Sequence, residues 1–416
     1  MSKKVVFTIV AKNYLPLARA LKWSIDNKNK TDVDFIIFLA DEEDGLVTRL
    51  DAENIIPVSN LEIPGLTDWA FKYNVTEFCT SVKPSCFKYV FEKLNADAAI
   101  YFDPDIFVFN DLQSIFDDLN DKDIVVTPHY LTNQINYTGD QKETMTLFVG
   151  IFNFGFVAFK NTKLSLSILN WWENRLSDQC YADRQDALHT DQKWADFLPV
   201  YAGDRLHIST SLGYNLAPWN IFERKIVDGD TLCVINRLTK VKEKLIFVHF
   251  AGFAPDNLTL IHKDFWDLTI DKYPDYDIVR KLYIEVTDKF DFKEMKSLSY
   301  TYSTFTNGDF ISDFHRRLYR AMSENGYDFI NPFDVNNEFY QILAKSKMVL
   351  KKKPVKRNSK TYQHFDSQRN KINFLLKSVF RLLGADRYFL LMGFMNRYTR
   401  PENQTFLLKK DIKKIY

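Results

Sequence analysis

The chain has 416 residues, of which 46% are hydrophobic and 15% aromatic, so it is too apolar for a disordered protein and long enough for two to three domains. The formal net charge of +1 hides a division: residues 345–416 carry 19 Lys and Arg against 4 Asp and Glu, whereas residues 1–344 carry 36 against 50. The four cysteines have no paired spacing, which argues against a zinc site or a disulfide framework and favours reduced thiols in a cytoplasmic protein. No apolar run is long enough to predict a membrane span.

The N-terminal segments alternate between strand and helix patterns. Apolar runs at 5–11 and 35–40 predict buried strands, 15–25 has apolar residues at helical spacing, and 53–58 predicts a short third strand. This alternation predicts an α/β fold whose sheet is mainly parallel, with helices on both faces. The turn at 11–14 reads Ala-Lys-Asn-Tyr and lacks the glycines of a dinucleotide-binding turn, which argues against a nicotinamide-dependent dehydrogenase.

The apolar run at 98–108 predicts a strand buried on both faces, and two carboxylates interrupt it. Pro104 between Asp103 and Asp105 lacks a backbone N–H, so regular strand pairing should stop where the two acids emerge. Open α/β sheets bind ligands at the carboxyl ends of their strands. Two carboxylates at such an edge suit a Mg²⁺ or Mn²⁺ ion that also holds a diphosphate. The alternative is an Asp-Pro turn that only closes the strand.

Further polar residues lie on predicted strands and helices downstream. Lys83 precedes the strand that delivers the two acids, and Asn153 and Gly155 interrupt a long apolar strand. This interruption indicates either close backbone approach by a ligand or a bulge. Asp191 and the following Gln192 begin a predicted helix, where Asp191 would serve equally well as an N-cap.

Two other segments carry candidate binding residues. The loop at 213–220 mixes aromatic and amide side chains, including Tyr214, Asn215 and Trp219, a composition expected where a sugar ring is stacked and its hydroxyls are hydrogen-bonded. His249 ends a buried strand shortly before a glycine turn. A histidine in that position is either a metal ligand or a structural residue of the core.

Taken in order, these motifs resemble nucleotide-sugar glycosyltransferases of the GT-A fold, in particular glycosyltransferase family 8 and related bacterial enzymes that build surface polysaccharides. The resemblance spans about residues 5–255. The matching positions are Asn13-Tyr14, Lys83, Asp103-Pro104-Asp105, Phe152-Asn153-Phe154-Gly155, Asp191-Gln192 and His249-x-x-Gly252.

The resemblance implies a GT-A (Rossmann-like) mixed, mainly parallel sheet flanked by helices. It implies Mn²⁺ or Mg²⁺ as cofactor, with metal ligands Asp103, Asp105 and His249. It implies donor-binding residues Ala11, Lys12, Asn13, Tyr14, Lys83, Asn153, Gly155 and Gly252, with Tyr14 against the base and Lys83 against phosphate. It also implies that Asp191 and Gln192 contact the sugars at the reacting centre, whether the enzyme inverts or retains configuration.

One position departs from the family-8 pattern. The lysine that normally follows the His and Gly and touches the diphosphate is replaced by Pro255. Lys83, Lys12 or Lys263 would then have to supply that cation. Family 8 would suggest that the enzyme retains the anomeric configuration of the sugar, and this departure weakens that expectation.

The C-terminal third changes in character. Beyond a catalytic domain at 1–255, residues 256–345 predict a helical addition near the acceptor site, and 346–416 predict a basic amphipathic tail. Within the tail, a polybasic linker at 351–357 precedes an amphipathic helix at 369–383. This pattern suits an anionic membrane surface at the inner face of the cell membrane, although the helix would also suit a partner enzyme or the acidic body of the chain.

The sequence therefore predicts a metal-dependent hexosyltransferase that moves a sugar from a nucleotide-diphosphate donor, expected to be a UDP-sugar, to a glycan or lipid-linked acceptor. Two other functions fit parts of the pattern: a sugar-phosphate nucleotidyltransferase, which would need a Gly-rich loop that is absent, and a non-catalytic polysaccharide- or membrane-binding scaffold. Nucleic-acid binding is not expected, because the tail lacks aromatics interleaved with its basic residues.

Overall fold

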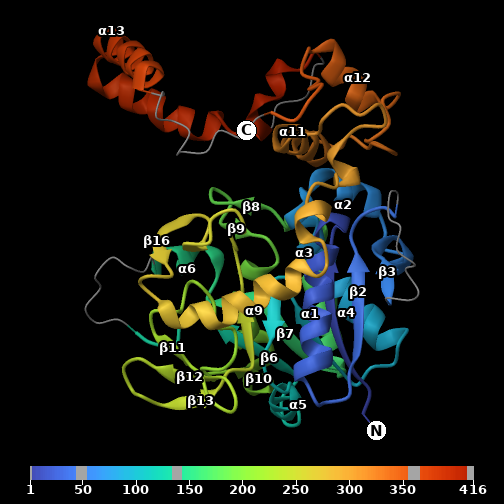
Figure 1. Ribbon diagram of the computed structural model, residues 1–416. Coiled ribbons are helices and arrows are strands. Elements are labelled where there is room, and N and C mark those ends of the chain that lie inside the picture. Colours follow the sequence, from blue (N-terminus) through green and yellow to red (C-terminus); the bar gives the residue numbers. More distant parts are fainter. Residues whose placement is uncertain (1, 44–53, 134–142, 355–365, 410–416) are drawn as a thin grey trace. The chain divides into compact units, whose positions relative to one another are not determined.

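The computed structural model describes residues 2–43, 54–133, 143–354 and 366–409. The chain forms two compact units (Figure 1). The sheet unit comprises Met1–Leu66 and Val75–Tyr300, and the helical unit comprises Thr67–Asn74 and Thr301–Tyr416. The chain thus enters the helical unit twice, and these limits differ from the functional division at 255 and 345 that the sequence predicts.

A seven-stranded sheet forms the centre of the sheet unit. Its strands, in spatial order, are β10 (Leu206–Ile208), β6 (Ile124–Pro128), β7 (Phe152–Lys160), β4 (Ala98–Phe102), β1 (Lys4–Val10), β2 (Asp34–Leu39) and β3 (Ile55–Pro57). All of them run parallel except β7, which is antiparallel to both β4 and β6. The prediction of a mixed, mainly parallel sheet is therefore confirmed.

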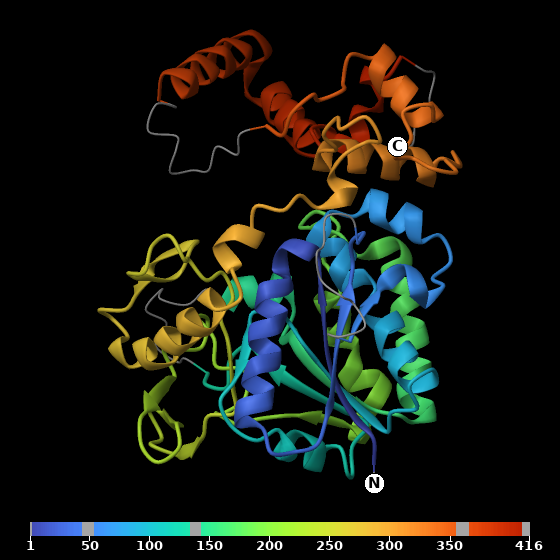
Figure 2. The same ribbon diagram turned by 45° about the vertical axis from the view of Figure 1, so that its right-hand side comes forward.

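Helices cover both faces of this sheet (Figure 2). On one face, α1 (Leu15–Lys28) contributes Leu21 and Ile25 to a core that also holds alternate strand residues such as Val6 and Ile100. On the other face, Phe87 of α4 (Lys83–Glu92) packs edge-on against Phe7 of β1, and α7 (Lys163–Gln179) lies beside α4. Since side chains alternate along a strand, burial on both sides explains why these strands are apolar throughout.

Short antiparallel strands extend the sheet unit. β5 (Ile106–Val108) pairs with β14 (Phe247–His249), and β15 (Leu260–His262) pairs with β16 (Phe265–Thr269). The remaining strands and helices of the unit are α3 (Val75–Ser81), α5 (Gln113–Asp118), α6 (Glu143–Val149), β8 (Ala182–Asp183), β9 (Leu188–His189), α8 (Leu198–Ala202), β11 (Arg224–Val227), β12 (Cys233–Asn236), β13 (Lys242–Lys244), α9 (Asp277–Asp288) and α10 (Phe292–Met295).

The helical unit packs around Phe71, which lies on α2 (Leu66–Lys72). Its ring contacts the rings of Phe305, Tyr319, Phe333 and Phe339. The other helices are α11 (Asp313–Glu324), α12 (Glu338–Lys345) and α13 (Asp366–Tyr398). The helical addition predicted at 256–345 includes α11 and α12. The core of this unit therefore includes a segment from the N-terminal quarter of the chain.

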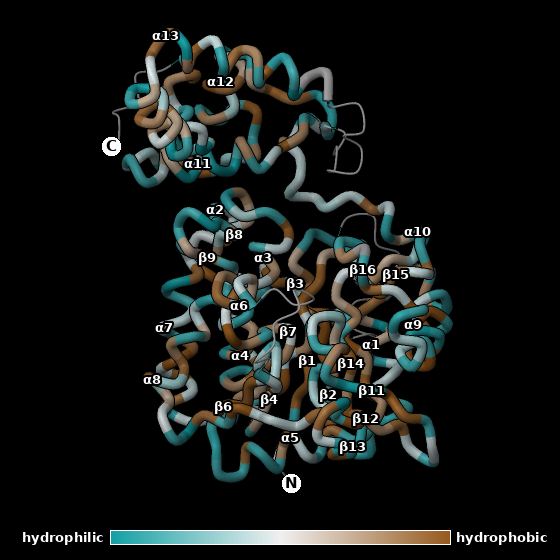
Figure 3. Tube along the Cα trace, turned by 90° about the vertical axis from the view of Figure 1, so that its left-hand side faces the viewer, coloured by the Kyte–Doolittle hydropathy of each residue, from teal (hydrophilic) through white to brown (hydrophobic). Residues whose placement is uncertain are grey.

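The predicted amphipathic helix at 369–383 lies within α13, along which hydrophobic and hydrophilic residues are mixed (Figure 3). The backbone of α13 is interrupted at Gly384, which has a φ of 74°. Residues 355–365 and 410–416 of the predicted tail, including part of its polybasic linker, lie outside the described residues. Among the described helices, none combines the length and apolar character needed to cross a membrane.

Candidate metal centre

The break in the strand at Asp103-Pro104-Asp105 brings the two acids next to His249. β4 ends at Phe102 and β5 begins at Ile106, so pairing stops where Pro104 predicts and resumes, after a gap of three residues, with a different partner. That partner is β14, whose His249 lies opposite Ile106. Backbone hydrogen bonds fix both acids, because Asp103 N donates to Gly155 O (2.7 Å) and Phe250 N donates to Asp105 O (2.8 Å). Residues 144 positions apart therefore meet at the carboxyl end of β4.

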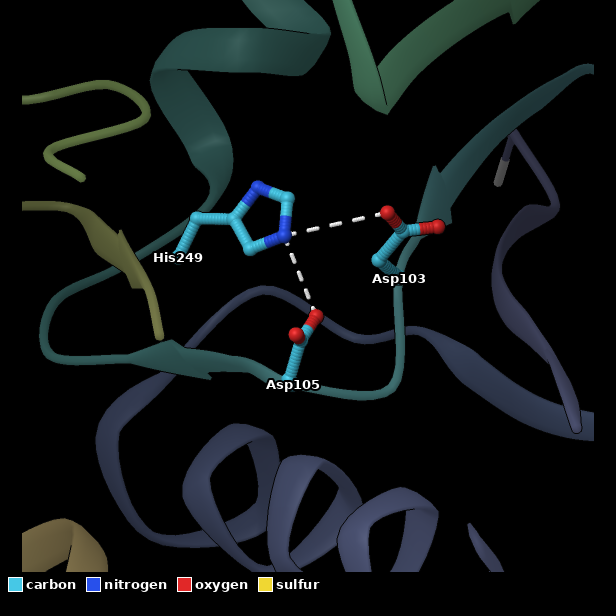
Figure 4. Close-up of side chains that lie close together, drawn as sticks. All are labelled: Asp103, Asp105 and His249. Carbon is cyan, nitrogen blue, oxygen red and sulfur yellow. Dashed lines mark ion pairs between the residues drawn. The ribbon is translucent and has the colours of Figure 1, made fainter. Parts of the chain in front are cut away.

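The three side chains converge (Figure 4). His249 Nε2 lies 3.1 Å from Asp105 Oδ1 and 3.7 Å from Asp103 Oδ2, and one ligand atom from each residue lies within 4.8 Å of the others. The imidazole is 4% exposed, whereas the carboxylates are 31% and 23% exposed. Two carboxylate oxygens and an imidazole nitrogen, open on one side, are a donor set that fits Mn²⁺ or Mg²⁺ with room for further oxygen ligands.

Gly155 is required by this convergence. A Cβ atom at this position would lie 2.3 Å from Cε1 of His249 and 2.9 Å from Oδ2 of Asp103. The sequence indicates close approach by a ligand or a bulge at this glycine. In the structure, the β6–β7 register shifts between Val157 and Phe152, an irregularity that spans Gly155, and side chains of the cluster make the close approach.

Asn153 orients the imidazole. Nδ1 of His249 lies 3.2 Å from Oδ1 of Asn153, which also accepts from Nδ2 of Asn215 (3.0 Å). If Nδ1 carries the proton, Nε2 presents its lone pair to the two carboxylates, as a metal-ligating histidine requires. Asn153 therefore lies behind the metal cluster, as well as on the strand that the resemblance places near the donor sugar.

The charges of the cluster depend on one another. Burial disfavours the charged imidazole, but Asp105 and Asp103 outweigh it, so the pKa of His249 is raised. Burial raises the pKa of Asp103, and Lys83 and His249 offset this only in part. Burial is the largest influence on Asp105 and raises its pKa, but the charge and hydrogen bond of His249, a backbone hydrogen bond and the charge of Lys263 together outweigh it, so the pKa is lowered. Three ionisable groups in one partly buried cluster are the arrangement expected of a functional site.

Lys83 and Asp191 form a buried ion pair. Their side chains are 1% and 3% exposed, and Nζ of Lys83 lies 2.5 Å from Oδ2 of Asp191. Lys83 also donates to the carbonyl of Phe154 (2.8 Å). Asp191 precedes the 3-10 helix Gln192–Phe197 but makes no side-chain cap, so the N-cap alternative is not realised. The side chains of Lys83 and Asp191 are thus paired with other groups of the protein.

Gln192 is likewise engaged with the chain. Its Oε1 accepts from the backbone N–H of Phe154 (3.0 Å) and its Nε2 donates to the carbonyl of Val149 (2.8 Å). These bonds hold the start of the 3-10 helix against β7, on which Asn153 and Gly155 also lie.

The predicted donor loop lies at the end of β1. Ala11 and Lys12 are buried and Asn13 is half-buried, whereas Tyr14 is 41% exposed. Burial raises the pKa of Tyr14, and the charge of Asp105 raises it further. The loop follows β1, which pairs in parallel with β4, so both strands end at the same edge of the sheet. The backbone N–H of Lys12 donates to Asp41 (3.3 Å), a buried carboxylate just after β2.

Of the predicted acceptor-binding residues, only Trp219 lies at the cluster. Tyr214 and Asn215 are 4% and 0% exposed, so they have almost no surface for a sugar to contact. Trp219 packs edge-on against the ring of His249, with centroids 5.2 Å apart, and its indole N–H has no hydrogen-bond partner among the described residues. Nδ2 of Asn215 donates to the hydroxyl of Thr127 (2.8 Å) and to Oδ1 of Asn153, so this amide is used inside the protein.

Gly252 follows His249 in a turn that needs a positive φ, here 64°. A Cβ atom there would lie 2.1 Å from Nε2 of His262, and the backbone N–H of Lys263 donates to the carbonyl of Gly252 (2.8 Å). The β15–β16 turn is thereby held next to the cluster.

Sequence reasoning missed Asp41, Tyr101 and His262 as members of this region. Asp41 follows the carboxyl end of a predicted strand, which is a usable signal. Tyr101 reads as one more residue of an apolar strand, and His262 lies outside any recognisable motif.

Comparisons with known proteins find partial similarity. No protein-family model matches the chain. The uncharacterized protein YfnF of Bacillus subtilis (strain 168) is 24% identical over 252 residues, which is 59% of this chain and 80% of that protein. Among solved structures, the galactosyltransferase LgtC in complex with donor and acceptor sugar analogues is 17% identical, with a TM-score of 0.43, over 69% of this chain and 95% of that one. The glycosyltransferase GlyE of Streptococcus pneumoniae TIGR4 is 12% identical, with a TM-score of 0.38, over 73% and 67% of the two chains.

Proposed function

We propose that this protein is a metal-dependent glycosyltransferase of the GT-A type, which transfers a hexosyl group from a nucleotide-diphosphate donor, a UDP-sugar, to a glycan or lipid-linked acceptor of a bacterial surface polysaccharide. One observation carries the proposal: Asp103, Asp105 and His249 converge at the carboxyl end of β4, whose parallel neighbour β1 leads into the turn that ends in Tyr14. Ligands of open α/β sheets bind at this edge.

Asp103, Asp105 and His249 would hold Mn²⁺ or Mg²⁺. When bound, such an ion neutralises the charge that develops on a departing diphosphate. The chain's own contribution is to fix three donors: Asp103 and Asp105 in the turn between β4 and β5, and His249 at the end of β14. The half-exposed ring of Tyr14 would stack on the base, and the strand carrying Asn153 and Gly155 would lie along the donor sugar.

Lys263 is the cation best placed to replace the lysine that Pro255 displaces. Lys12 and Lys83 are 5% and 1% exposed, whereas Lys263 is exposed. Its charge lowers the pKa of Asp105, and its backbone is tied to Gly252. A flexible ammonium at this place would contact diphosphate oxygens.

The test is a panel of nucleotide sugars with and without Mn²⁺, read first by thermal unfolding and then by hydrolysis or transfer. A ligand present at 100 times its dissociation constant stabilises the folded protein by about 2.7 kcal/mol. We expect stabilisation by a UDP-sugar only with metal, and its loss in Asp103→Asn. Stabilisation by a nucleoside triphosphate and sugar phosphate would instead support a nucleotidyltransferase. Stabilisation without turnover would support a non-catalytic scaffold.

We further propose that α13 binds an anionic membrane surface. Several apolar side chains of this helix are exposed: Ile372, Phe374, Leu375, Phe380, Leu382, Phe389, Leu390 and Phe394. Residues 366–409 carry 8 Lys and Arg against 3 Asp and Glu. Exposed apolar side chains with an excess of cations favour the interface of a negatively charged bilayer over a neutral one.

Vesicle flotation of the full chain tests this second proposal. We expect binding to vesicles containing phosphatidylglycerol and much weaker binding to phosphatidylcholine alone. Each basic residue near the surface contributes about 1 kcal/mol, so Lys377→Glu with Arg381→Glu should weaken binding at least about tenfold. Lys240→Glu with Lys242→Glu, the same charge change in the sheet unit, is the matched control. Equal binding by both double variants would contradict the assignment.

A further inference from the structure

We infer that Lys83, Asp191 and Tyr101 are positioning residues that hold Asp103 as a metal ligand, in place of the phosphate-binding and sugar-contacting roles that the resemblance implies for the first two. The inference deepens the proposed function, because it rests on the metal site proposed above. It concerns four residues that come from four different segments: α4, β4, the turn after β4, and the turn before the 3-10 helix.

Lys83 has little capacity left for a ligand. Its ammonium is 1% exposed and contacts three groups: Oδ2 of Asp191 (2.5 Å), the carbonyl of Phe154 (2.8 Å) and the ring of Tyr101 (4.0 Å to the centroid). An ammonium has three donors, and both oxygen acceptors and the aromatic face satisfy its charge. A phosphate could reach it only by displacing these partners.

Asp191 is equally enclosed. Its Oδ1 accepts from the hydroxyl of Thr190 (3.1 Å), its Oδ2 accepts from Lys83, and its backbone carbonyl accepts from the indole N–H of Trp172 (3.2 Å). Both carboxylate oxygens thus have protein partners, and a substrate hydroxyl could reach them only by displacing these partners. Asp191 is therefore suited to neutralise Lys83.

Tyr101 connects this ion pair to the metal cluster. It lies two residues before Asp103, and the ammonium of Lys83 lies over its ring. Its hydroxyl donates to Oδ1 of Asp103 (2.5 Å). The other oxygen of Asp103, Oδ2, is the one that faces His249 at 3.7 Å. The hydrogen bond thus determines which carboxylate oxygen is presented to the metal, a task that hydrogen-bonded neighbours of metal ligands commonly perform.

Removing the hydroxyl of Tyr101 tests the connection directly. Tyr101→Phe keeps the ring over Lys83 and deletes only the bond to Asp103. We expect its dissociation constant for Mn²⁺ alone, measured by calorimetry or by electron paramagnetic resonance, to rise about 10- to 100-fold, while its unfolding temperature stays near that of the wild type. Tyr276→Phe is the control, because that buried hydroxyl has no partner among the described residues, and it should bind Mn²⁺ as the wild type does.

The ion pair is tested by its two single variants and their combination. Asp191→Asn and Lys83→Met should each weaken Mn²⁺ binding and lower the unfolding temperature. The double variant should recover part of the unfolding temperature, because neither charge is then left unpaired. If Asp191 contacted the sugars instead, Asp191→Asn would reduce kcat for transfer and leave the Mn²⁺ dissociation constant unchanged. That result, or wild-type Mn²⁺ affinity in Tyr101→Phe, would overturn the inference.

Failure of the proposed function gives a different pattern. If the wild-type protein binds no Mn²⁺ at all, both the metal site and the positioning network are refuted together. If it binds Mn²⁺ and uses a nucleotide sugar but Tyr101→Phe matches it, only the positioning network is refuted.

Discussion

Gly155 allows His249 and Asp103 to approach one another, because any side chain at that position would occupy the space between them. The constraint is local, and a single methyl group is enough to violate it.

Gly155→Ala is therefore expected to abolish Mn²⁺ binding. The new Cβ would lie 2.3 Å from Cε1 of His249, so the imidazole or β7 must shift. Overpacking of this kind costs about 1–3 kcal/mol of folding free energy. Isothermal calorimetry and chemical denaturation measure the two effects. Gly393→Ala is the control, because nothing lies near its Cβ position, and it should change neither.

Asp105→Asn should reduce metal-dependent transfer on the order of a thousandfold, because metal assistance supplies several kcal/mol of transition-state stabilisation. The folded protein should persist, since the side chain is 23% exposed and its backbone carbonyl keeps the hydrogen bond from Phe250. Steady-state kinetics with and without EDTA check this. The exposed Asp121→Asn should behave as the wild type. Full activity of Asp105→Asn in EDTA would remove the metal assignment.

Lys263→Ala should raise the KM for the nucleotide-sugar donor by about tenfold, because it removes one charge-assisted contact that contributes about 1.5 kcal/mol. Lys263→Arg should restore most of the affinity if the contact is ionic. Lys242→Ala removes an exposed lysine elsewhere in the sheet unit and serves as the control. An unchanged KM in Lys263→Ala would indicate that another cation contacts the diphosphate.

At the scale of the elements, the strand break at Pro104 and the cap of α11 follow directly from local chemistry. Ser312 caps α11 by accepting from the backbone N–H of His315 (3.3 Å), and the His315 ring accepts in turn from the backbone N–H of Ser312 (3.2 Å). The other ring nitrogen of His315 lies 2.9 Å from the carbonyl of Met348. The imidazole must be neutral to make both bonds, one as acceptor and one as donor.

This cap predicts a loss of stability in acid. Burial lowers the pKa of His315 below its ordinary value of 6.5. The unfolded chain therefore binds a proton more readily, so the contribution of His315 is fully present above the unfolded value and is lost as the pH falls below it. Urea unfolding at about pH 7.5 and about pH 5 should show a smaller loss in His315→Gln than in the wild type. Burial also lowers the pKa of His129 and His262, to about 4. Both the wild type and His315→Gln should therefore lose some stability in acid. An equal loss of stability in the wild type and in His315→Gln would contradict the role of His315.

At the scale of the whole molecule, the two units are not consecutive in sequence, because a short segment of the N-terminal part belongs to the helical unit. Residues 67–74 lie between β3 and α3 of the sheet unit in sequence but belong to the core of the helical unit. Arg316 of α11 binds this segment, donating to the carbonyls of Ala70 and Phe71.

Phe71→Ala should therefore destabilise the helical unit, although this residue precedes α11 by more than 240 positions. Truncating a buried aromatic costs about 3–5 kcal/mol. Limited proteolysis should cleave the variant within 301–354 while leaving the sheet unit intact and able to bind Mn²⁺. Phe91→Ala, a buried phenylalanine of α4, should destabilise the sheet unit instead. Cleavage of both units to the same extent in Phe71→Ala would argue against two separately packed cores.

The sequence by itself determined the mainly parallel sheet, the break at Pro104 and the helices of the C-terminal third, because apolar periodicity, proline and capping residues act over a few neighbouring positions. It also indicated Asp103, Asp105 and His249 as one candidate set, through the order of motifs. Only the tertiary structure decided that Lys83 faces Asp191, that Tyr101 holds Asp103, that Asn215 is buried, and that residues 67–74 join the helical unit. Those outcomes depend on which strands pair and which faces pack together, and no short stretch of sequence encodes such contacts between distant segments.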